Sequence, residues 1–389
     1  MKAASFREIR FDAVVIHYGE ITLKRSKRGL FERMLHRNLR RFTGLPVRRL
    51  QGRFVIDLSP EIDLERLLER LGKVFGVVWY APAVRADTLE EIQERISEAV
   101  SVINPESIKV DTRRSDKSFP ITSIEISRRI GKFLSSRLGV EVDLKNPELR
   151  IFVELTEDGI YASFEKLRGP GGLPLGSSGR VLGLFSGGSH SALACWFMMK
   201  RGCAVDLLHV HSLSSGEEVL KTEFKSAVDK LLEYSMKLRL YLAPSTPFMD
   251  RARDAPETAR PLLFKGYLIR VGELLAERRG YPGLVLGERI EKPEDAEEVG
   301  ILLSGRSLPI YTPLLALPED EIHRKIELLE LRSEYSDPLS GLGAGRGKCS
   351  AKEFERLWRR LELEEAAGDA ADAVEVYLAD LAGFRRAGS

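Results

Sequence analysis

Short apolar runs alternate with segments of helical periodicity from residue 181 onward, and this alternation constrains the fold more than any other feature. Strands that are separated by helices need crossover connections, so such strands pair in parallel. We therefore expect a mainly parallel sheet, with more helix over residues 351–381. The strands are expected at 181–185, 204–211, 238–243, 283–287 and 308–315, and the helices among and after them at 191–201, 217–234, 262–279 and 319–331.

The chain before residue 168 shows a different pattern, with two small α/β units that meet near residue 72. Glycine and proline then accumulate over residues 168–179 and interrupt all periodicity, which is typical of a linker. Strands are expected at 12–17, 54–58, 79–84, 107–113, 149–155 and 160–167, and helices at 60–71, 88–102 and 123–138.

Positive charge is concentrated between Lys24 and Arg53, where 11 basic residues stand with one acid, Glu32. The whole chain has 60 Lys and Arg against 58 Asp and Glu, a net charge of only +2. Apolar residues recur inside the block at helical spacing, which predicts an amphipathic helix with a cationic solvent face. The block favours a phosphate-bearing partner; the alternative is a solvated helix face without a ligand.

The segment FSGGSHS, residues 185–191, joins a predicted buried strand to a predicted helix. Gly187 and Gly188 permit a tight turn with accessible amides, the helix N-terminus adds positive potential, and Ser186 and Ser191 add hydroxyl groups. These features predict an anion-binding loop, although it follows neither the Walker A nor the dinucleotide pattern. The alternative is an ordinary glycine-rich turn.

The stretch SGGSHSALA resembles the SGGxDSxxA loop of the tRNA 4-thiouridine synthetase family, the tRNA sulfurtransferases. HYGEITLKRSKRGLFERMLHRNL resembles the N-terminal module of that family, and VDTRRSDKSFPITSIEISRRIG resembles its tRNA-binding THUMP domain. The resemblance implies a ferredoxin-like module at 1–72, a THUMP domain at 73–168, a linker at 169–180 and an adenine nucleotide alpha-hydrolase-like (PP-loop) domain at 181–389. It also implies a member without the rhodanese extension.

The activity implied by the resemblance is ATP-dependent formation of 4-thiouridine in tRNA, at uridine 8, with ATP and Mg²⁺ and a link to thiamine biosynthesis. The implied partners are tRNA and a persulfide sulfur donor, either a cysteine desulfurase or a small-molecule sulfide, and a homodimer is expected. The nucleotide positions fall on Leu184, Phe185, Ser186, Gly187, Gly188, His209, Val210, Lys265 and Gly287, the catalytic ones on Ser186, His190, Ser191 and Cys349, and the RNA-binding ones on Lys24, Arg25, Arg37, Arg40, Arg41, Arg113, Arg114 and Lys117.

Three positions depart from the family pattern. His190 replaces the loop aspartate, Ala296 stands where a nucleotide-contacting glutamine is expected, and the C-terminal element GKCSAKEF retains one thiol, Cys349. Two alternatives therefore remain open beside the sulfurtransferase. One is a tRNA-binding protein of the same ancestry whose nucleotide site no longer catalyses, and the other is ATP-dependent tRNA modification with a different nucleophile.

The three cysteines, Cys195, Cys203 and Cys349, are too few and too far apart for a disulfide framework. We expect Cys195 and Cys203 to be packing residues, whereas basic neighbours favour a thiolate at Cys349. A metal site on His190, His209 and His211 is geometrically possible, but we predict none. Because the sequence shows neither an apolar run of about 18 residues nor a secretory signal, we expect a cytoplasmic protein.

Overall fold

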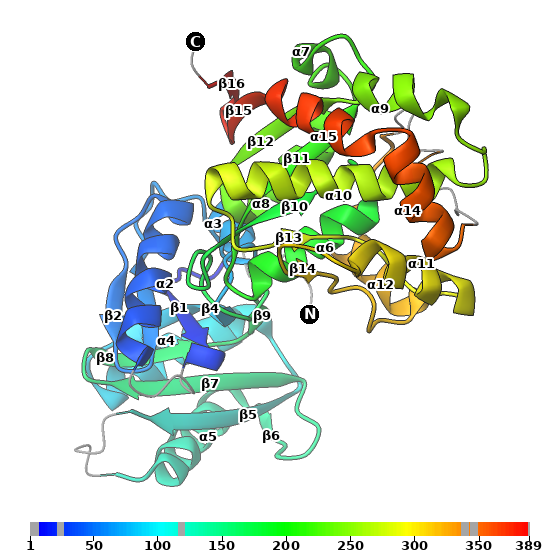
Figure 1. Ribbon diagram of the computed structural model, residues 1–389. Helices are drawn as coiled ribbons and strands as arrows, with labels where there is room; N and C mark the ends of the chain where they lie inside the picture. The colour runs from blue at the N-terminus through cyan, green and yellow to red at the C-terminus, as the bar shows by residue number, and fades with distance from the viewer. Residues whose placement is uncertain (1–7, 22–26, 116–120, 336–341, 343–348, 388–389) are drawn as a thin grey trace. The chain divides into compact units, whose positions relative to one another are not determined.

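The computed structural model of the protein describes residues 8–21, 27–115, 121–335, 342 and 349–387 (Figure 1). The chain forms two compact units, Met1–Pro174 and Leu175–Ser389. The division falls inside the linker predicted at residues 169–180. Among the described residues, no helix has the length and apolar character needed to cross a membrane.

The first unit is built on one nine-stranded sheet in the order β2-β3-β1-β4-β8-β7-β5-β6, with β9 paired to β4. Its strands are β1 (Ala13–Tyr18), β2 (Arg48–Leu50), β3 (Arg53–Asp57), β4 (Val77–Ala86), β5 (Ser107–Arg114), β6 (Glu141–Val142), β7 (Leu149–Thr156), β8 (Gly159–Ser163) and β9 (Leu167–Arg168). Its helices are α2 (Arg28–Thr43), α3 (Leu64–Leu71), α4 (Leu89–Ile103) and α5 (Ser123–Leu138).

Strand β4 connects the two parts of this unit. It pairs antiparallel with β1 on one side, where Ala13 lies opposite Ala83, and with β8 and β9 on the other. The two N-terminal parts expected from the sequence therefore share a continuous hydrogen-bonded sheet. Helices α4 and α5 cover the β5–β7–β8 part, where Ile96 and Ile130 pack with Ile151 in a buried core.

Helix α2 is the basic helix expected from the sequence. Its buried side includes Leu35, Leu39 and Phe42, and the single acid Glu32 is also buried. Arg28 and Arg49 both pair with Glu32, so part of the positive charge is neutralised inside the unit. The exposed face carries Arg33, Arg37, Arg40 and Arg41, which confirms the predicted cationic solvent face.

A buried ion-pair network joins strands β1, β3 and β7. His17 donates from Nε2 to the Glu154 carboxylate at 3.1 Å, and Arg53 pairs with the same carboxylate and also donates to Ser115. The indole of Trp79 stacks on the His17 ring at 3.8 Å. Burial lowers the pKa of His17 although Glu154 opposes the shift. Burial opposes ionisation of Glu154, but the contacts with His17 and Arg53 hold its pKa below the ordinary value.

The second unit contains a seven-stranded sheet in the order β14-β13-β10-β11-β12-β15-β16. The first five strands are parallel, and β15 and β16 are antiparallel additions, so the predicted mainly parallel sheet is confirmed. The strands are β10 (Arg180–Leu184), β11 (Ala204–His211), β12 (Lys237–Pro244), β13 (Leu284–Val285), β14 (Ile310–Tyr311), β15 (Glu375–Asp380) and β16 (Gly383–Arg386).

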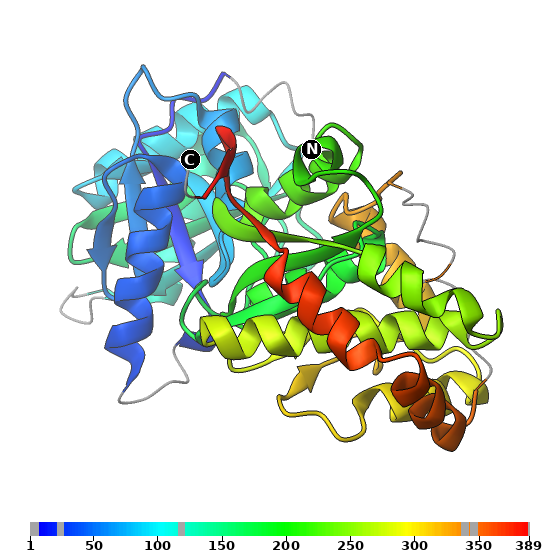
Figure 2. The same ribbon diagram turned by 45° about the horizontal axis from the view of Figure 1, so that its top comes forward.

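Helices cover both faces of this sheet. On one face, Leu182 and Leu184 of β10 share a core with helices α10 and α15, which cross that face together in both ribbon views (Figures 1 and 2). On the other face, Gly183 lies against Cys195 of α6, where an added Cβ would stand 2.6 Å from the sulfur. The helices are α6 (Ser189–Lys200), α7 (Gly216–Val219), α8 (Phe224–Ser235), α9 (Thr246–Arg251), α10 (Arg260–Arg279), α11 (Pro293–Leu303), α12 (Glu319–Leu328), α14 (Ala351–Arg360) and α15 (Leu363–Asp372).

Three predicted helices were wrong in extent. The helix expected at 217–234 is divided into α7 and α8, because the Thr222 side chain bonds back to Val219 and accepts from the Phe224 amide. The helix expected at 351–381 is interrupted at Glu362, whose φ is +50°, and its last part is strand β15. The helix expected at 60–71 begins only at Leu64, since the side chain of Asp63 caps it.

We expect the network around Glu154 to make stability depend on pH. The pKa of His17 is lower in the folded than in the unfolded chain, so the unfolded chain binds more protons below about pH 6.5 and folding stability falls on acidification. The lowered pKa of Glu154 adds a loss that begins at still lower pH. His17→Gln keeps a donor near the carboxylate but does not titrate, so wild type should lose more stability than this variant between pH 7.5 and pH 5. Urea unfolding at several pH values measures this difference, and parallel curves would contradict the expectation.

Candidate active site

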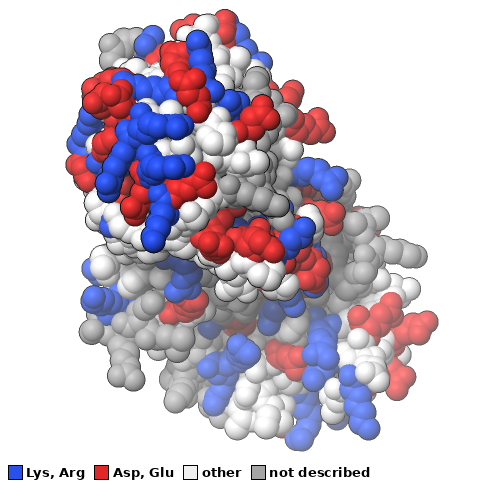
Figure 3. Space-filling model, turned by 45° about the vertical axis from the view of Figure 1, so that its right-hand side comes forward, with Lys and Arg blue, Asp and Glu red and all other residues white. Residues whose placement is uncertain are grey.

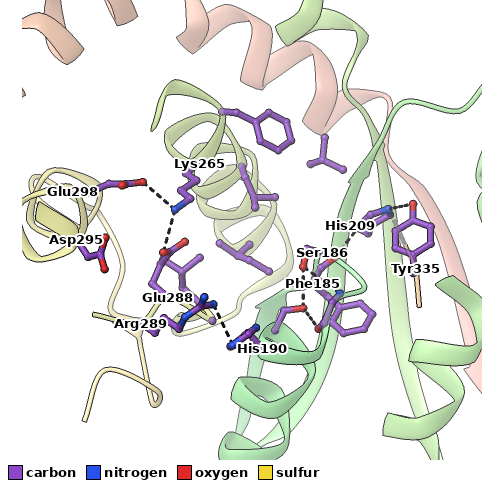
Figure 4. A pocket seen from close by; sticks show the side chains of 18 of the residues that line it. Phe185, Ser186, His190, His209, Lys265, Glu288, Arg289, Asp295, Glu298 and Tyr335 are labelled. Atoms are coloured by element: carbon purple, nitrogen blue, oxygen red, sulfur yellow. Dashed lines mark hydrogen bonds and ion pairs between the residues drawn. The ribbon is translucent and has the colours of Figure 1, made fainter. Parts of the chain in front are cut away.

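A cavity of about 360 Å³ opens at the carboxyl ends of β10, β11 and β13 in the second unit (Figure 4). In sheets of this type, ligands bind beyond the carboxyl ends of the strands, where neighbouring connections diverge. The lining residues come from the loop after β10, the end of β11, helices α10 and α11, the segment after β13, and Tyr335. A volume of this order is suited to a small organic ligand.

The loop between β10 and α6 forms one wall of the cavity. Gly188 is the N-cap of α6 and has no side chain to satisfy the amides of the first helical turn. The hydroxyl of Ser191 donates to the Gly188 carbonyl at 2.8 Å and lies 3.1 Å from the Ser186 hydroxyl, which accepts from the Gly188 amide at 3.3 Å. These bonds fix the loop with backbone amides and the positive end of the helix at the cavity, as an anion site requires.

Two glycines make this arrangement sterically possible. Gly187 has φ +83°, and a Cβ there would lie 2.4 Å from the ring of Tyr335. At Gly287 a Cβ would lie 2.9 Å from the Cα of Ser191. Gly287 therefore lets the segment after β13 approach the start of helix α6 closely, beside the loop.

Apolar side chains line another part of the cavity. They come from strand β10, the end of β11, helix α10 and the segment after β13. Such a surface suits a planar base or another weakly polar group, while the loop suits an anion. These residues are Leu184, Val210, Phe264, Leu268 and Leu286.

Lys265 lies at the far end of the cavity from the loop, between two carboxylates (Figure 4). Its Nζ is 3.2 Å from Glu288 and 2.9 Å from Glu298. Burial alone would lower the pKa of Lys265, but the two carboxylates raise it above the ordinary value. Burial also raises the pKa of Glu288, against the opposing charge of Lys265. Lys265, one of the nucleotide positions implied by the resemblance, is thus a charged lysine that two acids neutralise in part.

His190 occupies the position where the resemblance leads one to expect an aspartate. Its Nε2 accepts a hydrogen bond from Arg289 at 3.1 Å and lies 3.7 Å from the carboxylate of Glu319. Burial and the charge of Arg289 lower the pKa of His190, although Glu319 opposes the shift. Near neutral pH this position therefore carries an uncharged acceptor, and Arg289 bonds to His190, Glu291 and Glu319.

The predicted site residues of the second unit gather at one cavity, except Gly187 and Cys349. The cavity is lined by Leu184, Phe185, Ser186, Gly188, His190, Ser191, His209, Val210, Lys265 and Gly287, and Gly187 belongs to the loop without lining the cavity. Cys349 is not among the lining residues and packs instead beside the core of α10 and α15. Burial and the charge of Glu353 raise the pKa of its thiol to about 11, so the expected thiolate was wrong. The prediction that Cys195 and Cys203 are buried packing residues is confirmed.

The predicted RNA-contacting residues that the structure describes lie in the first unit. Arg37, Arg40 and Arg41 are exposed on α2, and Arg113 is exposed near the end of β5. Arg114 donates to the carbonyl of Ile121 at 2.6 Å. Lys24, Arg25 and Lys117 lie outside the described residues. Figure 3 shows one face of the molecule, on which acidic and basic side chains alternate rather than separate.

Sequence reasoning missed nine of the residues that line the cavity, among them Glu288, Arg289, Glu298 and Tyr335. Glu288 and Arg289 directly follow the strand-end Gly287, so their position was a usable signal. Glu298 lies on α11 and Tyr335 follows α12, and neither residue belongs to a sequence motif. Only the folded chain brings these two residues to the cavity.

His190, His209 and His211 are the residues at which the sequence made a metal site geometrically possible. The rings of His209 and His211 lie 6.4 Å apart, and His190 is bonded to Arg289. Within the part of the chain that the structure describes, no group of three or more His, Cys, Asp or Glu side chains is arranged to hold a metal ion.

Comparison with known proteins agrees with this architecture. The thiamine biosynthesis protein (ThiI) family matches residues 176–332, the ThiI ferredoxin-like domain matches 13–81, and the THUMP domain matches 86–165. A probable tRNA sulfurtransferase from Brevibacillus brevis is 33% identical and covers 95% of this chain and 96% of its own. The chain belongs to the tRNA sulfurtransferase family. A Methanobrevibacter smithii member of this name is 35% identical, with 82% of this chain and 86% of its own covered.

Solved structures show the same fold. A 4-thiouridine synthetase in complex with RNA and bound ATP superposes with a TM-score of 0.83 at 24% identity, covering 95% of this chain and all of that chain. A Pyrococcus horikoshii structure gives a TM-score of 0.63 at 28% identity, covering 82% of this chain and 99% of that one. The resemblance to the tRNA sulfurtransferase family and the predicted fold class are thus confirmed.

We expect Lys265 to stabilise the second unit by compensating its two acids. Lys265→Met should lower the free energy of unfolding by about 3 kcal/mol, since it leaves two buried carboxylates without their cation. Adding Glu288→Gln and Glu298→Gln should recover part of this loss. Urea unfolding of the full chain measures both effects, and a triple variant no more stable than Lys265→Met would contradict the explanation.

Proposed function

We propose that this member of the tRNA sulfurtransferase family is an ATP-dependent transferase that makes 4-thiouridine in tRNA, at uridine 8. The supporting observation is that one cavity combines two kinds of surface. Its apolar walls suit adenine, and the N-terminus of α6 beside them suits phosphate. Bound ATP would transfer its adenylyl group to the uridine carbonyl oxygen and release pyrophosphate, which turns that oxygen into a leaving group. The terminal sulfur of the persulfide donor would then displace AMP, and a second thiol would cleave the S–S bond to the donor, releasing 4-thiouridine and forming a disulfide.

The chain's own residues divide this work. Leu184, Val210 and Leu286 would enclose the base, and the amides from Ser186 to Ser191 would bind and orient the phosphates. These donors are fixed before the reaction, so they stabilise the charge that develops during adenylyl transfer without reorganising. The hydroxyl of Ser186 would contribute a further donor at the same point, whereas the hydroxyl of Ser191 already donates to the Gly188 carbonyl and supports the loop. Mg²⁺, if it takes part, would be held mainly by phosphate oxygens and water.

The first unit would bind the tRNA. The exposed arginines of α2 and Arg113 of β5 present cations that can contact the phosphates of a folded RNA without reading its bases. The persulfide donor, the homodimer and the cytoplasmic location predicted from the sequence stay predictions.

A second candidate keeps the tRNA and ATP sites but uses no persulfide on this chain. It is favoured by Cys349, because this thiol does not line the cavity and its pKa is raised to about 11. The proposal would then require sulfur to reach the activated uridine from a small-molecule sulfide, or another nucleophile to take its place.

Mass spectrometry of nucleosides tests the reaction directly. Unmodified tRNA incubated with the protein, ATP, Mg²⁺ and either a persulfide donor or sulfide should gain 4-thiouridine, and Cys349→Ser should abolish the gain only if the thiol carries the sulfur. Gly187→Ala is the matched negative control, since its Cβ has no room in the loop. Normal tRNA affinity without any 4-thiouridine would contradict the proposed reaction and support the alternative, a tRNA-binding protein whose nucleotide site no longer catalyses.

Charge reversal tests the RNA surface. Changing Arg37, Arg40 and Arg41 to Glu should weaken tRNA binding at least tenfold and reduce the slope of log affinity against log salt by roughly 2 to 3, because about one phosphate contact is lost per residue. A filter-binding series at several salt concentrations measures both quantities.

The matched control reverses three exposed arginines of the second unit, Arg253, Arg324 and Arg385, with side chains 74–77% exposed. These changes alter the net charge equally. An equal loss of affinity in both triple variants would show that overall charge, and not the face of α2, determines binding.

A further inference from the structure

Residues 331–335, which we call the strap, follow helix α12 and run along the loop after β10. The amide of Ser333 donates to the hydroxyl of Ser189 at 3.1 Å, and Lys230 donates to the carbonyl of Arg332. The hydroxyl of Ser333 in turn accepts from the amide of Tyr335 at 3.2 Å. The strap is thus attached to the first residue of α6 on one side and to α8 on the other, and it delivers Tyr335 to the cavity.

The ring of Tyr335 closes the back of the loop. A Cβ added at Gly187 would lie 2.4 Å from the ring of Tyr335. The same Cβ would lie 3.0 Å from the ring of Phe224, which therefore fills this space from a second side. His209 stacks on Phe224 with ring centres 4.2 Å apart, and Tyr335 meets both rings edge-on. Gly187, with φ +83°, is therefore packed against the rings of Tyr335 and Phe224, and His209 supports these two rings from behind.

A chain of hydrogen bonds runs from Tyr335 into the backbone of the loop. His209 Nδ1 is 3.0 Å from the Phe185 carbonyl, and His209 Nε2 is 3.2 Å from the Tyr335 hydroxyl (Figure 4). A carbonyl can only accept, so Nδ1 carries the proton and donates to it. In the neutral ring Nε2 must then accept, and the donor is the hydroxyl of Tyr335. The direction of the chain is fixed by this chemistry.

The consequence concerns the peptide that joins Phe185 to Ser186. A trans peptide directs its carbonyl and its amide to opposite sides. Because His209 holds the carbonyl of Phe185, the amide of Ser186 is turned the other way. A free carbonyl at this position would be able to rotate toward a bound anion and repel it. The bond to His209 prevents this rotation at the first peptide of the loop.

We propose that Tyr335 is a positioning residue for the phosphates of the nucleotide: through His209 and Gly187 it keeps the loop in its anion-binding form. This inference rests on the proposed ATP-dependent function. Tyr335 acts on the loop and not on the base, so its removal should affect ligands that carry phosphate and spare those that do not.

Calorimetry with ATP and with adenosine tests this distinction. Tyr335→Phe retains the ring and loses only the hydroxyl, so ATP affinity should fall about fivefold, while adenosine affinity stays within twofold of wild type. Tyr335→Ala also releases Gly187 and should weaken ATP further. The matched control is Tyr311→Phe, on exposed strand β14 of the same unit, which should change neither affinity.

A double-variant cycle identifies the route. His209→Asn can keep an amide donor near the position of Nδ1, but its shorter side chain places no acceptor at the position of Nε2, so Tyr335→Phe should have little further effect in a His209→Asn background. Additive losses would show that the two residues act separately and would overturn the proposed relay.

The remaining outcomes also decide the matter. Equal losses for ATP and adenosine, unchanged ATP affinity in Tyr335→Phe, or tighter ATP binding in Tyr335→Ala would each overturn the positioning role, the last by showing that the ring obstructs the loop. Failure of the wild type to bind ATP would be seen without any variant. It would overturn the proposed function itself, and with it this inference.

Discussion

The cavity of the second unit depends on how closely two pieces of backbone approach each other. Gly287, at the end of β13, lies so near the Cα of Ser191 that no side chain fits between them. This contact sets the first turn of α6 beside the strand ends and so directs the helix amides into the cavity. The lining residues from β10, β11 and α10 share a site because this approach brings their elements to one edge of the sheet.

Charge in this protein is arranged by partial compensation. Glu32 neutralises arginines inside the first unit while other arginines of the same helix stay exposed. Lys265 is likewise held by Glu288 and Glu298 in the second unit. Removing one partner of such a buried ion pair costs folding free energy, while the two acids hold the lysine in one orientation. Net charge along the sequence is therefore a poor guide to the potential that a ligand meets.

Much of the fold was accessible from the sequence because its signals are local. The parallel strands follow from apolar runs separated by amphipathic helices, and α2 follows from helical spacing within a basic block. One failure has a local cause and the other a non-local one. Thr222 interrupts one helix with a side-chain bond, and the C-terminal segment became strand β15 because β12 offers it an edge to pair with. No local signal in that segment reports the presence of the edge.

The site was predictable in part for the same reason. Ser186, Gly187 and Gly188 lie in one motif, and His209 and Gly287 stand at strand ends, so strand order alone places them together. Glu298 reaches the cavity from helix α11 and Tyr335 from the strap after α12. The contact between Tyr335 and His209 joins residues more than a hundred positions apart in the sequence. Cys349 shows the reverse case, since basic neighbours in sequence suggested a thiolate and burial in the fold opposes one.

The position of β4 at the centre of the first sheet has a consequence for how that unit folds. A strand that is hydrogen-bonded on both edges cannot separate from either neighbour without exposing unpaired backbone groups on that edge. The amides of β4 should accordingly be among the slowest of the unit to exchange with solvent hydrogen, and both parts should unfold in a single cooperative step. The two regions that match separate family models, residues 13–81 and 86–165, should then behave as one folding unit.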